Sequence, residues 1–327
     1  MLTQDRMTLL LDGSVALNFN PVGTIWKNQN FNCTGELPMN ANTSASPGLI
    51  RRTLKSPPAR ILVLGFLMVY LMAMNGDNAI SYGSDPIKAL IHTIAIAIAG
   101  FAVYIGYARF IEQRDASELA LPGMGRELGI GLLIGFGLYT VCILILMVMG
   151  IYRVEGFNPL TFLLPALAMA VSSGVFEELL FRGVLFGSIE RMFGSWTALV
   201  VSSLLFGLVH LMNPQATMEG ALFIAVEAGI LLAGAYMLTG RLWMSMGFHF
   251  SWNYTQEGIF SGIVSGNDAA QGLVKSSISG PDLLTGGSFG VESSILALAV
   301  CTTTGIILVY KAVKRGRIVP PFWERKA

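Results

Sequence analysis

The sequence predicts an all-α, polytopic membrane protein, a bundle of about eight transmembrane helices with both termini in the cytoplasm. Of its 327 residues, 53% are hydrophobic and only 13% are charged. Soluble globular proteins carry about a quarter charged residues, so this composition excludes an ordinary soluble domain. Long apolar stretches recur along the chain, and basic residues gather in every second connection between them.

The apolar stretches are long enough for helices that cross a bilayer, which need about 20 predominantly apolar residues each. They also exclude a transmembrane β-barrel, whose strands are much shorter. The stretch 159–190 is either one long helix or two joined helices. The predicted spans are 58–75, 87–108, 128–150, 159–190, 196–212, 219–239, 241–257 and 290–311.

Lys and Arg residues in the connections predict the orientation, because cytoplasmic loops carry an excess of both. Basic clusters precede the first span and follow the second and the last span. The opposite connections hold only Lys88, Arg153 and Lys275. We therefore expect both termini in the cytoplasm and the Gly- and Ser-rich connection 258–289 on the outer side.

Three regions are predicted along the chain. Residues 1–57 form a polar cytoplasmic tail whose composition is typical of a mobile segment. Residues 58–312 form the transmembrane domain, and 313–327 form a short basic cytoplasmic tail. No secretory signal peptide is visible. The net charge of +1 gives no reason to expect a nucleic-acid partner.

Ionisable residues inside the predicted spans are few, and six of them fall within 73 residues of sequence. A charge at mid-helix costs roughly 2.5–3.5 kcal/mol on insertion scales, so such residues normally face a protein interior or a wet cavity. Their grouping indicates a functional site. The six residues are Glu177, Glu178, Arg182, His210, Glu227 and His249.

Helical spacing gives the two neighbouring glutamates different surroundings. Glu178 and Arg182 are four residues apart, so they share a helix face and can pair. Glu177 is rotated by about 100° from Glu178 around the helix and cannot use Arg182 equally well as a partner. Its carboxylate is therefore available for another role. The turn RMFGSW, centred near Gly194, lies 17 residues after Glu177 and 16 before His210. Antiparallel helices therefore bring this carboxylate and this imidazole to nearly the same depth, where they can share a water molecule.

Three short motifs occur in order on separate predicted helices. They are EELLFR at 177–182, FGLVH at 206–210 and HFSWN at 249–253. These motifs resemble those of the CPBP intramembrane proteases, which include the type II CAAX prenyl endopeptidases and bacterial bacteriocin-processing and Abi-like members. The resemblance covers the core 159–257, whereas the tail and the connection 258–289 lie outside it.

The resemblance implies an intramembrane endopeptidase that hydrolyses a peptide bond in a membrane-associated substrate, such as a prenylated CAAX tail or a leader-bearing protein. Matched by motif position, Glu177 is the general base and His210 helps it to activate a water molecule. His249 and Asn253 match the pair that stabilises the oxyanion. Peptide hydrolysis needs both an activated water and a donor aimed at the developing charge, so these residue types suit the chemistry.

Three further motif positions are given supporting roles by the same resemblance. Glu178 and Arg182 match positions that stabilise the fold, and Phe206 matches the family's aromatic position. The expected partners are the lipid bilayer and a membrane-associated peptide or protein. The expected location is the plasma membrane of a prokaryote, as an integral multi-pass protein, and no cofactor is expected.

Other functions stay open at this stage. Glu177, His210 and His249 could bind zinc, since two His and one Glu form a familiar zinc set. No HExxH motif accompanies them. The cluster could instead be the proton relay of a proton-coupled transporter, although the inverted repeats common in such folds are not visible. A non-catalytic membrane scaffold is a third possibility.

Overall fold

A computed structural model of the chain describes residues 8–11, 15–18, 48–81, 85–268 and 271–325. The chain divides into two compact units, Met1–Ser46 and Pro47–Ala327. The described part of the first unit is an antiparallel hairpin of β1 (Thr8–Leu11) and β2 (Val15–Asn18). Most of the predicted tail 1–57 lies outside the described residues.

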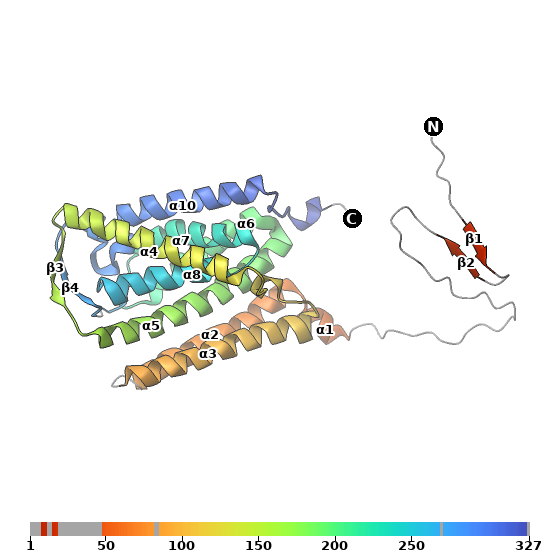
Figure 1. The fold of residues 1–327 in the computed structure, drawn as a ribbon, viewed down its shortest axis with the longest axis horizontal. Helices are drawn as coiled ribbons and strands as arrows, with labels where there is room; N and C mark the ends of the chain where they lie inside the picture. Colours follow the sequence, from red (N-terminus) through yellow and green to blue (C-terminus); the bar gives the residue numbers. More distant parts are fainter. Residues whose placement is uncertain (1–7, 12–14, 19–47, 82–84, 269–270, 326–327) are drawn as a thin grey trace. The chain divides into compact units, whose positions relative to one another are not determined.

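The second unit is a bundle of helices, which confirms the predicted all-α class (Figure 1). Its apolar runs are rich in Leu, Ala, Ile and Met, and α2 and α3 begin with Pro residues, which suit the first helical turn. Helix α10 packs against α7, α7 against α6, and α8 against α4, while α2 and α3 pack together and α3 contacts α5. The main helices are α1 (Leu49–Leu54), α2 (Pro57–Ser81), α3 (Pro86–Gly106), α4 (Met124–Val148), α5 (Leu163–Ser172), α6 (Gly187–Val209), α7 (Met218–Thr239), α8 (Trp243–Asn253), α9 (Asp282–Thr285) and α10 (Ile295–Lys314).

Six segments within the described residues are long and apolar enough to cross a membrane. This number is lower than the eight predicted spans for two physical reasons. The segment Leu160–Met212 holds two helical arms joined at Gly194, and α8 has only 11 residues before a six-residue π-helix, Tyr254–Ile259. The count of eight therefore stays a prediction. The six segments are Pro57–Gly76, Pro86–Glu112, Met124–Val148, Leu160–Met212, Met218–Thr239 and Ile295–Lys314.

A two-stranded sheet at one end of the bundle was not predicted (Figure 1). Strand β3 (Tyr152–Phe157) follows α4 and pairs antiparallel with β4 (Val274–Ile278) from the connection 258–289. The pairing joins segments more than 100 residues apart, so no local sequence pattern announces it. It ties the long connection 258–289 to the helical bundle.

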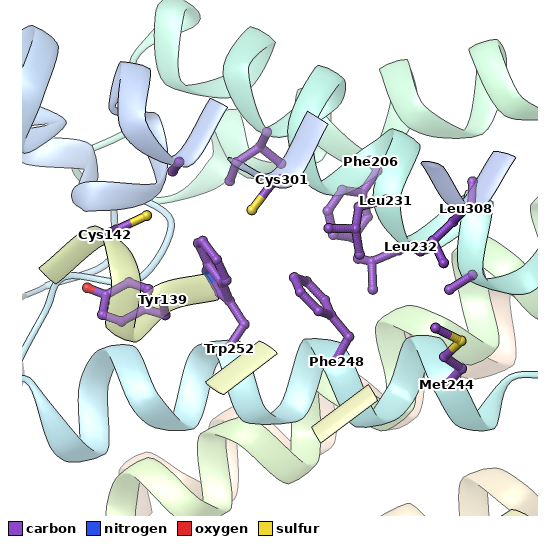
Figure 2. Packing of buried hydrophobic residues seen from close by; sticks show 14 of the residues in the cluster. Tyr139, Cys142, Phe206, Leu231, Leu232, Met244, Phe248, Trp252, Cys301 and Leu308 are labelled. Carbon is purple, nitrogen blue, oxygen red and sulfur yellow. The ribbon is translucent and has the colours of Figure 1, made fainter. Parts of the chain in front are cut away.

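Helix α8 lies unusually close to α4 because small residues face each other. A Cβ atom added at Gly131 would lie 2.2 Å from the Met244 carbonyl oxygen, and one at Gly135 would lie 2.4 Å from that of Phe248. This is the small-xxx-small spacing that lets membrane helices approach closely. Helix α8 also sends Phe248 and Trp252 into the buried core, where Trp252 meets Tyr139 of α4 edge-on with centroids 5.1 Å apart (Figure 2). The position of α8 is thus set by these contacts.

The predicted turn at Gly194 is confirmed, and it requires glycine. Its backbone has φ 81° and ψ 169°, which breaks the helix between the two arms of the segment. A Cβ atom there would lie 2.8 Å from the Val319 carbonyl oxygen. The next residue, Ser195, donates its N–H to that oxygen (2.9 Å), and its hydroxyl accepts from the Val319 N–H (2.9 Å). The C-terminal segment therefore braces the turn.

A buried network of charges joins four parts of the chain near the start of α2. Arg60 is 1% exposed and donates to the Tyr104 hydroxyl (2.6 Å) and to Glu118 (3.3 Å). Arg114 also binds Glu118, at 2.7 Å. Arg191 of α6 binds Glu112 at 2.9 Å. Three arginines that the sequence presents as charges flanking the spans are therefore partners in ion pairs.

The charge state of Glu118 depends on this network. Burial alone raises the pKa of Glu118, but the Arg114 guanidinium and the Tyr104 hydroxyl outweigh burial and lower the pKa from its ordinary 4.5 to about 2. A carboxyl whose pKa is lowered by folding stabilises the folded state above its unfolded pKa. This contribution is lost as the pH falls from 4.5 through about 2.

We expect Glu118→Gln to lower the Tm of detergent-purified protein near neutral pH, and the difference from wild type to shrink as the pH falls below 4.5. Thermal unfolding over a pH series measures this. The matched control is Asp115→Asn, three residues earlier, whose pair with Arg109 is exposed and should matter little. A Tm difference for Glu118→Gln that stays constant into the acid range would contradict the argument.

Candidate functional site

The two neighbouring glutamates lie on η4 (Ser173–Phe186), a π-helix that continues directly from α5. Stretches of π-helix are uncommon and occur frequently at functional sites. Glu178 is completely buried, whereas the side chain of Glu177 is 12% exposed. The two carboxylates therefore differ in access to solvent, as well as in direction.

Glu178 links two other charged or polar side chains. Its Oε1 accepts from Nη1 of Arg182 at 3.0 Å and from Nδ1 of His249 at 2.9 Å. Arg182 is 1% exposed, and its guanidinium also lies over the ring of Phe206, 4.3 Å from the centroid. The pairing of Glu178 with Arg182 has a signal in the sequence, the four-residue spacing. Its bond to His249, 71 residues away, has none.

Glu177 lies between the two histidines. Its Oε2 is 3.9 Å from Nε2 of His210 and 3.8 Å from Nε2 of His249. These separations are too long for direct hydrogen bonds, and this buried carboxylate oxygen has no hydrogen-bond partner among the described residues. One carboxylate oxygen and two imidazole nitrogens thus converge from η4, from the end of α6 and from α8.

The partners of the Nδ1 atoms determine which ring nitrogens face Glu177. Nδ1 of His210 lies 2.7 Å from the Phe206 carbonyl oxygen, which only accepts, so this nitrogen carries a proton and donates. Nδ1 of His249 likewise donates to the Glu178 carboxylate. In both rings the Nε2 atom is left to face Glu177. For a neutral His210, that atom presents a lone pair.

Phe206 packs in the middle of this arrangement. Its ring meets His210 edge-on with centroids 5.0 Å apart, and Phe181 in the same way at 5.0 Å. His249 lies 5.9 Å away. Figure 2 shows Phe206 among the buried side chains that also include Phe248. The Phe206 ring therefore packs against both imidazole rings and restricts their movement.

Asn253 lies one turn after His249 on α8 and is 5% exposed. Its Nδ2 donates to the hydroxyl of Ser173, the first residue of η4, at 2.9 Å. This bond fixes the orientation of the amide and leaves the second proton of Nδ2 for another acceptor. Ser173 was not predicted as a site residue, because no local spacing relates it to Asn253.

A cavity of about 450 Å³ opens beside these groups. Its polar lining includes Glu177, His210 and Asn253. Its apolar lining comes largely from α2, α5 and the residues around His210, and includes Val69, Met72, Ala73, Met169, Val209 and Met212. Apolar walls with a few convergent polar groups are typical of a binding site.

The connection 258–289 also contributes to this cavity. Ser265 and Asn267 line it, and Asn213, which follows His210, lies beside them. Ser265 and Asn267 were missed because no role was expected for 258–289, and Asn213 was missed because it lies outside the three motifs. The motifs lie on helices that precede the connection, and they carry no information about how it folds back.

Glu227, which matches no motif, is buried behind the histidines. It is 1% exposed, and it lines a second, small cavity of about 20 Å³ together with His249, Asn253 and Glu292. That volume has room for about one water molecule. The sequence favours a helix-packing or interfacial role for Glu227, and the structure places it next to the candidate site.

No group of three or more His, Cys, Asp or Glu residues in the described part of the chain is arranged to hold a metal ion. Glu177, His210 and His249, the set considered for zinc, lie in that described part. Oε2 of Glu177 is 3.8–3.9 Å from Nε2 of each histidine. Zinc binding by these three residues stays a hypothesis.

Residues 159–255 match the family model of the type II CAAX prenyl endopeptidases, Rce1-like. The match covers the motif-bearing core, which is less than a third of the chain. The predicted resemblance to the CPBP proteases is thereby confirmed. No curated protein and no solved structure matches the chain.

The Rce1-like match indicates an endopeptidase. Together with the six apolar segments, it identifies an integral multi-pass membrane protein whose substrate is a peptide at or within the bilayer. The matched residues include all three motifs and end just after Asn253. The cavity residues of the connection 258–289 lie beyond the match.

We expect the Glu178–Arg182 pair to control the stability of the Rce1-like core. Glu178→Leu leaves Arg182 buried without its carboxylate, and breaking such a pair costs about 3–5 kcal/mol. The double variant Glu178→Leu with Arg182→Met replaces both charges and should recover much of that loss. Yield and Tm in detergent measure both. Equal losses in the single and the double variant would contradict the role of an uncompensated buried charge.

Proposed function

We propose that this protein hydrolyses a peptide bond of a membrane-associated substrate, with Glu177 and His210 activating water and with His249 and Asn253 stabilising the oxyanion. The observation that carries the proposal is the convergence of Glu177 Oε2 with Nε2 of both histidines beside the cavity. The family match supports the class of reaction. The roles of the individual residues are our inference.

The spacing around Glu177 suits a bridging water molecule. Groups 3.8–3.9 Å apart are too distant to bond directly, and a water molecule can hydrogen-bond to both. Glu177 would take one proton from this water as general base. His210, with its Nδ1–H held by the Phe206 carbonyl, would accept the other water proton in a hydrogen bond through Nε2.

The reaction then proceeds in two balanced steps. The water oxygen bonds to the carbonyl carbon of the substrate, its proton passes to Glu177, and the carbonyl π electrons move onto oxygen. Asn253 donates to this oxyanion from Nδ2, and His249 donates from Nε2 when that nitrogen carries a proton. Collapse of the intermediate breaks the C–N bond, and Glu177 returns the proton to the leaving nitrogen.

The walls of the cavity suit a substrate that is partly lipid or partly membrane-embedded. Val69, Met72 and Met212 offer apolar contacts, while Glu177, His210 and Asn253 supply the polar groups of the lining. The family's name suggests a prenylated peptide ending in a CAAX sequence as the first substrate to test. A leader-bearing membrane protein is the second.

We expect Glu177→Gln to abolish hydrolysis without loss of folding, because the amide keeps the shape of the side chain and cannot act as a base. Removal of a general base lowers kcat by roughly 10²–10⁴. The measurements are cleavage of a farnesylated CAAX peptide by purified protein, and comparison of membranes for substrates with new carboxyl termini.

Two controls accompany Glu177→Gln. Glu219→Gln changes an exposed glutamate outside the site and should leave activity unchanged. The Tm of Glu177→Gln should stay close to that of wild type. Full activity of Glu177→Gln would refute its role as base, and a wild-type protein that yields no cleavage product in either assay would refute the proposed function.

Asn253 should act mainly in the transition state. Loss of one oxyanion donor costs about 10²–10³ in kcat, and we expect Asn253→Ala to fall in that range with little change in KM. Asn253→Asp should be at least as harmful, because it places a negative charge beside the developing one. A raised KM with unchanged kcat in steady-state kinetics would instead assign Asn253 to substrate binding.

The proposed mechanism requires no metal, and zinc is its direct competitor. If Glu177, His210 and His249 held zinc, active protein would contain the metal in stoichiometric amount. Elemental analysis and chelation test this. We expect activity to survive chelation. Stoichiometric zinc that is lost together with activity, and restores activity when added back, would establish the metalloprotease alternative.

A further inference from the structure

A tight turn from the connection 258–289 forms part of the wall of the candidate cavity. Ser265 and Gly266 both have left-handed backbones, with φ 51° and 72°, and the Asn267 N–H donates to the Val264 carbonyl at 2.9 Å. Two successive positive φ values closed by this bond define a type I′ turn. We call residues 264–267 the cavity turn.

The cavity turn is held from two directions. The Ser265 N–H donates to the Glu292 carboxylate, and the Ser265 carbonyl accepts from Asn213 at 2.6 Å. The Gly266 carbonyl accepts from the N–H of Gln215 at 2.7 Å. Asn213 and Gln215 follow His210 closely in sequence. The turn is therefore fixed relative to a candidate catalytic histidine.

Serine is an unfavourable residue at this position of the turn. The first central residue of a type I′ turn favours Gly, Asn or Asp, because other side chains are strained at positive φ. Ser261 has a similar φ of 55°, but its hydroxyl accounts for its presence there, since it donates to the Val274 carbonyl (2.6 Å) and accepts from the Gly272 N–H (2.7 Å). The side chain of Ser265 also has a partner, the Glu292 carboxylate, and it lines the cavity as well.

Ser265 adjoins the candidate catalytic groups on two sides. It lines the 450 Å³ cavity together with Glu177 and Asn253, and it lines the small inner cavity together with His249. A hydroxyl both donates and accepts, which matches the N–H and C=O groups of a peptide backbone. In a largely apolar cavity, a few polar groups on a rigid support orient the ligand.

We propose that Ser265 binds the backbone of the substrate peptide beside the scissile bond, an inference that rests on the proposed function. The cavity turn supplies the rigid support, because its bonds to Glu292, Asn213 and Gln215 hold the strained conformation in place. Ser265 is a substrate-binding residue in this view. The family match ends at residue 255 and assigns it no role.

The test compares Ser265→Gly with Ser265→Ala. Both remove the hydroxyl, but only glycine relieves the strain of a positive φ. The probe is a fluorescent farnesylated CAAX peptide, and its Kd is measured with full-length protein in detergent that carries Glu177→Gln to prevent turnover. We expect both variants to weaken binding by about fivefold to tenfold, the usual effect of one hydrogen bond. The glycine variant should have the higher Tm of the two.

The matched control is Ser261→Gly. It relieves a similar backbone conformation but removes two hydrogen bonds that hold the connection 258–289 together. We expect this variant to lower the Tm and to leave the Kd of the peptide unchanged. Binding and stability should thus change independently at the two serines.

Three outcomes separate this inference from the proposed function. An unchanged Kd in both Ser265 variants would overturn the role of Ser265, whatever the wild-type protein cleaves. A wild-type protein that binds the peptide without cleaving it would overturn hydrolysis, and the Kd comparison would still decide the role of Ser265. A wild-type protein that neither binds nor cleaves the peptide would overturn both.

Discussion

The two hydrogen bonds that Glu178 accepts, from Arg182 and from His249, determine the geometry of the rest of the site. A carboxylate and a guanidinium buried in an apolar bundle are costly apart, so they must stay together. Because the same carboxylate oxygen also accepts from His249, this constraint extends from η4 to α8. The ring of His249 is thereby directed with Nε2 toward Glu177, the neighbour of Glu178 in the sequence. A structural ion pair sets the geometry of the proposed catalytic groups.

The packing of α8 against α4 reinforces that constraint. Gly131 and Gly135 let the backbone of α4 approach α8 so closely that any side chain there would collide with it. Phe248 and Trp252 extend into the buried core. The helix that carries His249 therefore has little freedom to rotate or to slide. Such rigid support is what a preorganised oxyanion site needs, since the donors must be in place before charge develops.

The features that could be predicted from the sequence are those with a local signal. Apolar length reveals the spans, the four-residue spacing reveals the Glu178–Arg182 pair, and a glycine between two helical arms reveals the turn at Gly194. The features that could not be predicted join distant segments. The bond from His249 to Glu178 crosses 71 residues, and that from Asn253 to Ser173 crosses 80.

The fold of connection 258–289 and the partners of the buried charges could not be predicted for the same reason. The return of residues 264–267 to the cavity depends on contacts with Glu292 and Asn213, which no motif records. Arg60 reads in the sequence as a charge that marks the cytoplasmic side. In the fold it is buried beside Glu118, because the polar ends of several helices meet there. Composition reports such residues without reporting their partners.

The hydrogen bonds at the Gly194 turn control the position of side chains far along both helical arms. Glu177 lies 17 residues from this turn, a helical distance of roughly 25 Å. If the two arms hinged at the turn by about 5°, the carboxylate would move by about 2 Å relative to His210, by the geometry of a rod of that length. A displacement of even about 1 Å is enough to disable a catalytic arrangement. The two hydrogen bonds between Ser195 and Val319 thus fix an angle whose error would be magnified at the far end of both helices.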